Sequence, residues 1–147
     1  MLCRHYMVRS TPTVLDTATL AEAMAIMIKH RRQQLLVVDA KDEYVGEITT
    51  FTLARLLLPQ NGDGELSQEE AEEETVVDVD DRIAPYLGRR VSEFAEHDLP
   101  IMHPDTPLAH AIKLLASGKL RLPVVDPKTN KFVGAISSLS VLRRYQF

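Results

Sequence analysis

Five side chains between residues 61 and 70 carry oxygen atoms at the spacing used by a calcium-binding loop. In such a loop alternate residues supply oxygen ligands, a glycine makes a sharp turn, and a closing glutamate binds the ion with both carboxylate oxygens. Gly64 stands at the turn position and Glu70 at the closing position. The spacing therefore predicts a calcium site. Its ligands would be Asn61, Asp63, Glu65, Ser67 and Glu70.

The same stretch has a second interpretation as an exposed acidic linker. It resembles an EF-hand loop only from the third position onward, because Pro59 stands where the first ligand, normally aspartate, would be. The chain has no second loop of this kind to pair with it. Asn-Gly-Asp-Gly at 61–64 is also turn chemistry, and the glutamates that follow suit a solvated or disordered segment. We favour the linker interpretation.

Side chains suited to catalysis are scattered along the sequence. Cys3 is the only cysteine, and no base can be assigned to activate it. His103, Asp105 and His110 cluster near a predicted helix start, but their spacing is not that of a zinc site. No Ser-His-Asp, Cys-His or paired-carboxylate arrangement emerges. We therefore expect a protein that is not an enzyme.

The net charge of −4 conceals two regions of opposite sign. Residues 61–81 hold ten acidic residues and no Lys or Arg, so without these ten the net charge changes from −4 to +6. A mildly basic body suits an anionic small molecule. The basic residues are scattered and no aromatic platform accompanies them, which argues against a nucleic acid partner.

The sequence carries no signal for a membrane or for secretion. No apolar run approaches the roughly 20 residues that span a bilayer. The first ten residues, MLCRHYMVRS, lack the continuous apolar core of a signal peptide. A single cysteine excludes an internal disulfide and fits a reducing compartment. We expect a cytoplasmic protein without a membrane partner.

The first half of the chain predicts a strand at 13–15, a helix from residue 20, a strand hairpin at 35–38 and 44–48, and a short helix at 51–58. Thr19 and Glu22 have capping-box spacing, which starts a helix. Apolar residues then recur at the period of one helix face. They are Leu20, Ala23, Met24, Met27 and Ile28. Pro59 ends the last helix.

The second half repeats this pattern 88 residues later. Gly134 follows Gly46, and Pro100 follows Pro12, at this offset. The helix stripe recurs as Leu108, Ala111, Ile112, Leu115 and Ala116. We expect Ile112 to lie in the core, so that truncating it to alanine would cost about 2–5 kcal/mol. Strands at 119–125 and 132–136 and a helix at 138–144 complete the repeat, and agreement of stripe, offset and glycine indicates a duplication.

The repeated unit resembles the CBS domain, named after cystathionine β-synthase, and two in tandem look like a Bateman module. The second copy carries the closer match, with PDTPL at 104–108, LPVVD at 122–126 and GAIS at 134–137. The resemblance implies an α/β (α+β) fold of two β-α-β-β-α repeats packed as a pseudo-two-fold pair. The expected domains are repeat 1 with a lead-in at 1–58, an acidic linker at 59–90 and repeat 2 at 91–147.

Members of this family are regulatory modules that commonly bind adenosine compounds in clefts between the copies and commonly dimerise into a flat disc. The resemblance therefore implies a homodimer, an effector protein that the sequence does not name, and AMP, ADP, ATP or S-adenosylmethionine as ligand, with no obligatory cofactor. It assigns an apolar purine slot to Val14, Leu36, Met102 and Pro123, and the same four residues equally suit the hydrophobic core. The full ligand set that it implies is Thr13, Val14, Leu36, Thr49, Thr52, Met102, Pro123, Ser137, Ser140 and Arg143.

One departure from the family pattern leaves two functions open. The family's nucleotide signature is Ser or Thr followed three residues later by Asp, whose carboxylate suits both ribose hydroxyls. Thr49 and Ser137 keep the hydroxyl, but Thr52 and Ser140 stand where the aspartate would be. The hydroxyl residues also suit helix N-caps. The first hypothesis is a nucleotide sensor. The alternatives are a degenerate pair acting as a dimerisation or protein-interaction scaffold, and a calcium-responsive linker.

Overall fold

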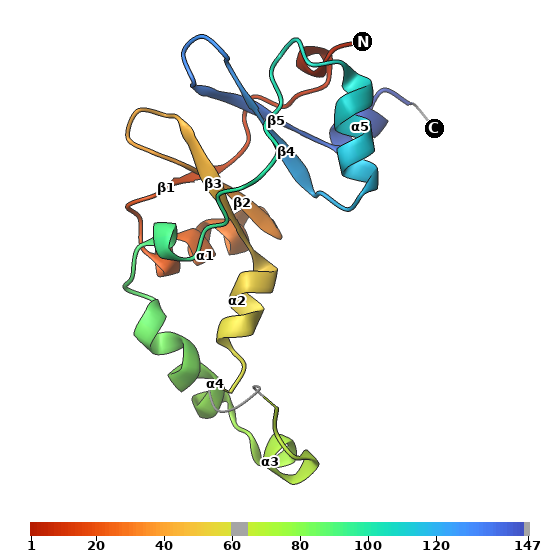
Figure 1. The fold of residues 1–147 in the computed structure, drawn as a ribbon. Coiled ribbons are helices and arrows are strands. Elements are labelled where there is room, and N and C mark those ends of the chain that lie inside the picture. The colour runs from red at the N-terminus through yellow and green to blue at the C-terminus, as the bar shows by residue number, and fades with distance from the viewer. Residues whose placement is uncertain (60–64, 146–147) are drawn as a thin grey trace.

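Each half of the chain folds into a small sheet with helices on one side, in a computed structural model that describes residues 1–59 and 65–145 (Figure 1). In the first unit β1 pairs in parallel with β2, and β2 pairs antiparallel with β3. Its elements are β1 (Thr13–Leu15), α1 (Leu20–His30), β2 (Gln34–Val38), β3 (Tyr44–Thr49) and α2 (Thr50–Leu56). The α+β fold and the element order predicted for this half are confirmed.

The second unit repeats this arrangement with one strand fewer. Its strands β4 and β5 form an antiparallel pair with the same bulge near the start of the turn as β2 and β3. Its elements are α5 (Leu108–Ala116), β4 (Arg121–Val125), β5 (Phe132–Ser137) and α6 (Ser138–Leu142). The counterpart of β1 is reduced to a single parallel bridge between Met102 and Val124. The two units are related by a pseudo-two-fold.

The lead-in of each repeat packs on the other repeat. Cys3 is fully buried in the core of the second unit, and Val91 is fully buried in the core of the first. Both begin short 3-10 turns, η1 (Cys3–His5) and η3 (Val91–Glu93). Backbone bonds fix the exchange, because Val8 pairs with Ala135 on β5 and Glu96 pairs with Glu47 on β3. Each hydrophobic core therefore contains residues from both halves of the sequence.

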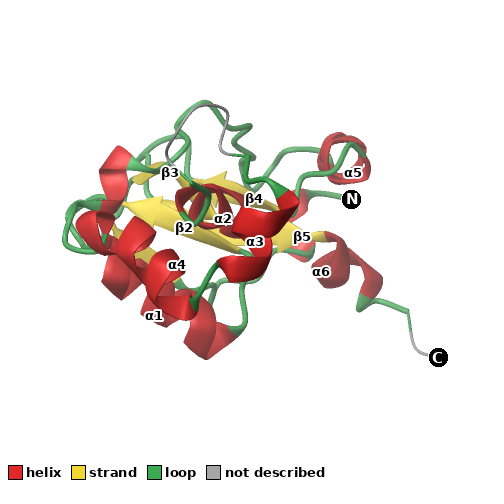
Figure 2. Cartoon of the chain, turned by 90° about the horizontal axis from the view of Figure 1, so that it is seen from below, coloured by secondary structure: helices red, strands yellow, loops and turns green. Residues whose placement is uncertain are grey.

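The faces of the two sheets that do not carry α1 or α5 meet each other. Leu36 and Pro123 are almost completely buried there, although neither belongs to a unit's own core. At the hairpin turns, Glu43 forms a bridge with Lys131, its own counterpart 88 residues later. In Figure 2 the strands occupy the middle of the molecule, with α1 on one side and α5 and α6 on the other. Apolar burial between the sheets holds the units together.

The helix stripes are narrower than the sequence predicts. Leu108 and Leu115 are buried as expected, but Ile112 is 45 % exposed and Ala116 is exposed, so the core assignment of Ile112 is wrong. In α1 the counterpart of Ala116, Ile28, is 74 % exposed. A short helix on a small sheet can bury only the residues on its inner line. Ile112 and Ala116 beside that line are exposed in the second copy, whereas in the first copy Ile28 is exposed and Met24 is partly buried against the core.

The described part of the connection between the repeats contains two helices and lies at the end of the molecule away from the second unit (Figure 1). They are α3 (Gln68–Glu73) and α4 (Val76–Ile83), followed by the 3-10 turn η2 (Ala84–Tyr86). The Arg82 guanidinium bonds to Glu74 and donates to the carbonyl of Leu57 at 3.0 Å, which ties α4 to the end of α2. Among residues 1–59 and 65–145, no helix is both long enough and apolar enough to cross a bilayer.

Candidate functional site

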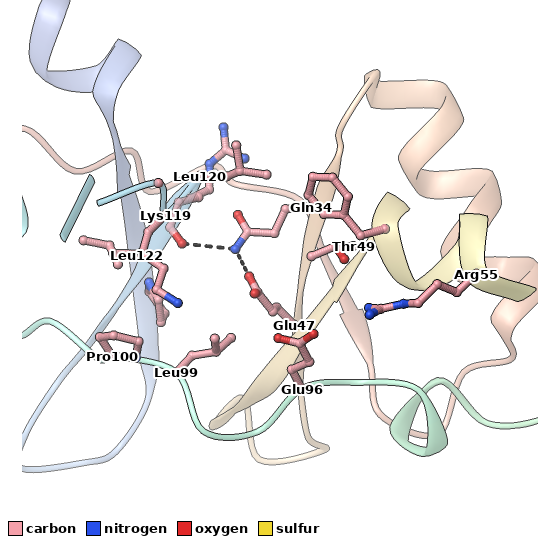
Figure 3. Close-up of a pocket in the computed structure, with 14 residues that line it drawn as sticks. Gln34, Glu47, Thr49, Arg55, Glu96, Leu99, Pro100, Lys119, Leu120 and Leu122 are labelled. Atoms are coloured by element: carbon pink, nitrogen blue, oxygen red, sulfur yellow. Dashed lines mark hydrogen bonds between the residues drawn. The ribbon is translucent and has the colours of Figure 1, made fainter. Parts of the chain in front are cut away.

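A cleft opens between the two sheets beside β3 and β4, as Figure 3 shows. Its cavity is about 230 Å³, and we call it the first cleft. Thr49 and Phe51 border it from the start of α2, and Leu99 and Pro100 from the exchanged segment. Its polar side chains are Gln34, Glu47, Thr49, Arg55, Glu96, Lys119 and Arg121.

A buried hydrogen-bonded pair forms the centre of the first cleft. The Gln34 amide bonds to the Glu47 carboxylate and also donates to the backbone carbonyl of Arg121 at 3.1 Å, which joins β2 to β4 (Figure 3). Glu47 is 8 % exposed. Burial raises the pKa of this carboxyl, Glu96 raises it further, and Lys119 opposes the rise.

The pseudo-two-fold places a second cleft beside β5. Its cavity is about 280 Å³. An adjoining cavity of about 490 Å³ shares Arg32, Arg121 and Ser137 with it and extends toward the first cleft. The residues around the second cleft come from the exchanged lead-in, the connection between α1 and β2, β4, β5, and α6 with the residue that follows it. They are Val8, Thr11, Arg32, Arg121, Ala135, Ser137, Leu139 and Arg143.

The two hydroxyl residues predicted to face a ligand are both helix N-caps that border a cleft. Thr49 accepts a hydrogen bond from the amide of Thr52 at 3.4 Å, and Ser137 accepts from the amide of Ser140 at 3.2 Å. Thr49 borders the first cleft and Ser137 the second. The capping interpretation is thus confirmed, and it leaves each hydroxyl at the edge of a cavity.

Thr52 and Ser140, which replace the family's aspartate, do not border either cleft. The Ser140 hydroxyl is buried, donates to the carbonyl of Ser137 at 2.8 Å and accepts from its amide at 2.9 Å. It therefore completes the capping box and does not point toward a ligand in this conformation.

The residues assigned to a purine slot separate into two groups. Val14 and Met102 lie within the cores of the two units. Leu36 and Pro123 lie between the sheets, and Pro123 also borders the first cleft. Thr13 pairs with Leu36 across β1 and β2. Arg143 borders the second cleft, where it could contact a ligand, and its ligand role stays a prediction.

The structure describes only part of the predicted calcium loop. Asn61 and Asp63 lie outside the described residues. Ser67 caps α3 and forms a capping box with Glu70, each side chain bonding to the other residue's amide. Two predicted ligands are therefore engaged in starting a helix. Within the described ranges no three His, Cys, Asp or Glu side chains gather as they would around a metal ion.

The sequence interpretation missed the charged residues that distinguish the clefts. Arg121 and Glu47 stand in otherwise apolar strands, on the face that alternation turns toward the other sheet. Each also lies on the strand face that carries the capping hydroxyl, since Glu47 precedes Thr49 by two residues. A charged residue on the inward-facing side of an otherwise apolar strand is the sequence signal that would have identified Arg121 and Glu47.

The match to a known protein family covers the same two repeats that the sequence shows. A family model for the CBS domain matches residues 3–59 and 91–146. A search of curated protein sequences finds no match. Among solved structures, the CBS-pair protein CBSX2 from Arabidopsis thaliana has a TM-score of 0.75 at 20% identity, covering 97% of this chain and 92% of that one.

Three further structures extend the comparison. The CBS domain pair of protein MJ0100, in complex with 5′-methylthioadenosine and S-adenosyl-L-methionine, has a TM-score of 0.66 at 23% identity, over 98% of this chain and 94% of that one. Protein MJ1004 of M. jannaschii has a TM-score of 0.70 at 16% identity over 98% of this chain, which spans only 58% of that protein. A second structure of CBSX2 is a complex with AMP. These TM-scores establish the shared fold.

Proposed function

The chain belongs to the CBS domain family, and we propose that it is a non-catalytic regulatory module that senses an adenosine-type nucleotide between its repeats and modulates a partner protein. The observation that carries the proposal is a pair of clefts related by the pseudo-two-fold, each lined by residues of both repeats and each edged by a capping hydroxyl. AMP in CBSX2 and adenosine derivatives in MJ0100 support this class of ligand.

The position of the clefts suits a sensor. Each cleft contacts both units and one exchanged lead-in, so a ligand there touches segments that are distant in sequence. A ligand that binds only this arrangement stabilises it by mass action. A partner protein that contacts both units can then respond to a ligand-induced change in how the units pack on each other.

The test is a thermal-shift screen against AMP, ADP, ATP and S-adenosylmethionine, followed by calorimetry on each hit. At a ligand concentration near 100 times Kd, the stabilisation of about 2.7 kcal/mol corresponds to a rise in Tm of about 5–10 °C. Thr49→Ala and Ser137→Ala identify the occupied cleft, since only the variant that borders it should reduce the ligand-induced shift. Absence of any shift across all four compounds would reject nucleotide sensing.

The scaffold function remains the alternative, and outward-facing apolar residues favour it. Ile112 and Leu142 border an apolar hollow between α5 and α6. Contiguous apolar surface of this kind marks a protein interface more often than a solvated face. We propose that a second copy of the chain covers it and gives a homodimer.

Light scattering on the wild-type protein and on Ile112→Glu tests the homodimer. The wild type should have twice the chain mass and the variant a single chain mass, with unchanged secondary structure by circular dichroism. A stable dimer that shows no thermal shift with any of the four adenine compounds would favour the scaffold over the sensor. A wild type that is monomeric at high protein concentration would exclude this interface.

A further inference from the structure

The two clefts share a backbone arrangement but differ in charge. The pseudo-two-fold relates Glu47 to Ala135, and it relates Glu96 to Val8, so both acidic positions of the first cleft are apolar in the second. Arg55 and Arg143 are a matched pair on α2 and at the end of α6. A ligand that fits both cavities by shape would therefore meet different electrostatics in each.

The first cleft presents carboxylates to a ligand. Glu47 is buried beside Gln34, and Glu96 borders the same cavity. The backbones of Glu47 and Glu96 pair with each other, which brings the two residues side by side at this cavity, and Glu96 raises the pKa of Glu47. Arg55, Lys119 and Arg121, which borders both clefts, offset this charge. A phosphate group entering here would be repelled by a buried carboxylate.

The second cleft presents arginines and no carboxylate. Arg32, Arg121 and Arg143 border its cavity, and neither this cavity nor the adjoining one has an acidic residue among its lining. Arg121 is partly buried, and its pKa falls to about 10 because of burial and because Arg32 is nearby. Neither Arg32 nor Arg121 forms an ion pair with any described carboxylate.

The arrangement of these two guanidinium groups is costly without a counterion. The Arg32 Nε is buried and has no hydrogen-bond partner within the described chain. Two like charges held together in a partly buried site repel each other, and an unsatisfied buried donor adds to the cost. An anion placed between them would satisfy the donor and cancel the repulsion, and guanidinium groups match phosphate oxygens in geometry.

We propose that the second cleft alone is the chain's phosphate-recognition site, with Arg32, Arg121 and Arg143 holding the anionic groups of a phosphorylated ligand, and that the first cleft rejects such groups through Glu47. The adenosine part of that ligand rests on the proposed function, whereas the phosphate preference rests on the arginines. Each chain should then take up a single polyanion, although it contains two clefts of the same architecture.

Calorimetric titration of the full chain with inorganic triphosphate, ATP and adenosine tests this site. Arg121→Gln introduces the residue type found at the related position, Gln34, and should weaken triphosphate binding about tenfold or more, since hydrogen bonds to charged groups are lost. Arg143→Gln, at an exposed position, should weaken it about three- to fivefold. Its matched control, Arg55→Gln in the first cleft, should leave the affinity unchanged.

A complementary variant introduces the missing carboxylate. Ala135→Glu reproduces in the second cleft the acidic residue of the first, and it should abolish triphosphate binding. Because Ala135 is buried, the fold of this variant is checked by circular dichroism. Arg143→Gln at the surface keeps the test decisive if Ala135→Glu does not fold.

The outcomes separate the site from the proposed function. A single triphosphate per chain, weakened by Arg121→Gln and Arg143→Gln but not by Arg55→Gln, supports the assignment. Two ions per chain, or equal loss in Arg55→Gln and Arg143→Gln, overturns it. If adenosine binds as tightly as ATP and triphosphate does not bind, the phosphate site is refuted while nucleoside sensing stands. If triphosphate binds as described but ATP binds no more tightly, the phosphate site stands and adenosine sensing fails.

Discussion

Substituting Gly46 by alanine tests the exchange of lead-in segments most directly. A Cβ atom at Gly46 would lie 2.3 Å from the carbonyl oxygen of Glu96 and 3.1 Å from its carbonyl carbon. This carbonyl belongs to the backbone of the exchanged segment, which has no flexible end to move away. The segment docks through two bonds, from the Glu47 amide to the Glu96 oxygen at 2.9 Å and from the Glu96 amide to the Glu47 oxygen at 2.8 Å.

The geometry sets the expected magnitude. An ordinary contact begins near 3.4 Å, so the segment would have to retreat by about 1 Å, beyond the range of good hydrogen bonds. Two lost bonds contribute about 1–3 kcal/mol. Overpacking of a close contact adds about 1–3 kcal/mol. We expect Gly46→Ala to lower the free energy of unfolding by about 2–6 kcal/mol.

Two other glycines calibrate the result. At Gly134 the added Cβ would lie 2.8 Å from the carbonyl oxygen of Val8, a milder overlap at the related position, so a smaller loss is expected. At Gly88 the Cβ would meet nothing within 4 Å, and alanine there should be neutral or slightly stabilising. Urea unfolding followed by circular dichroism, at one protein concentration, measures all three. A Gly46→Ala protein as stable as Gly88→Ala would refute the docking of the 96 segment on β3.

Further consequences follow for the helices and for pH. Leu108→Ala should cost about 2–5 kcal/mol in urea unfolding, whereas Ile112→Ala should cost less than about 1 kcal/mol and instead shift the light-scattering mass toward the single chain. Ser137→Ala should lose about 1 kcal/mol as an N-cap, and a loss no greater than that of exposed Ser138→Ala would contradict capping. Burial and Glu96 raise the pKa of Glu47 above its ordinary 4.5, so the folded chain holds this proton more tightly than the unfolded chain. Stability should therefore decline as pH rises from 4.5 through the raised pKa, and Glu47→Gln should remove that decline in a series of unfolding curves.

The elements of each repeat could be predicted because local signals agreed with the fold. The Thr19 capping box begins α1 where the sequence places it, and the paired strands lie within a residue or two of their predicted bounds. The 88-residue offset also gave the equivalence of Cys3 with Val91. The offset could not show that Cys3 and Val91 each belong to the core of the other unit. The two repeats align equally well whether each lead-in packs on its own repeat or on the other one.

The features that the sequence did not predict depend on how the elements pack, which local sequence signals do not report. Periodicity reports which residues share a helix face, but not how much of that face a small sheet covers, so Ile112 was assigned to a core that ends before reaching it. Charge composition marked the 61–81 segment as acidic but gave no sign that Ser67 and Thr75 would start helices there. The difference between the clefts, acidic side chains in the first and none lining the second, depends on side chains from both repeats, and only the folded arrangement brings those together.

The duplication explains why the two clefts can differ without loss of the fold. Their framework consists of backbone pairings, such as Val8 with Ala135 and Glu47 with Glu96, which do not depend on side-chain charge. The positions that face the cavities are therefore free to diverge once each repeat is encoded separately. A homodimer of single repeats would have to place the same residue in both clefts. A tandem pair can keep a carboxylate at Glu47 and an alanine at the related position, and so one chain can hold two sites of unlike charge within one symmetric frame.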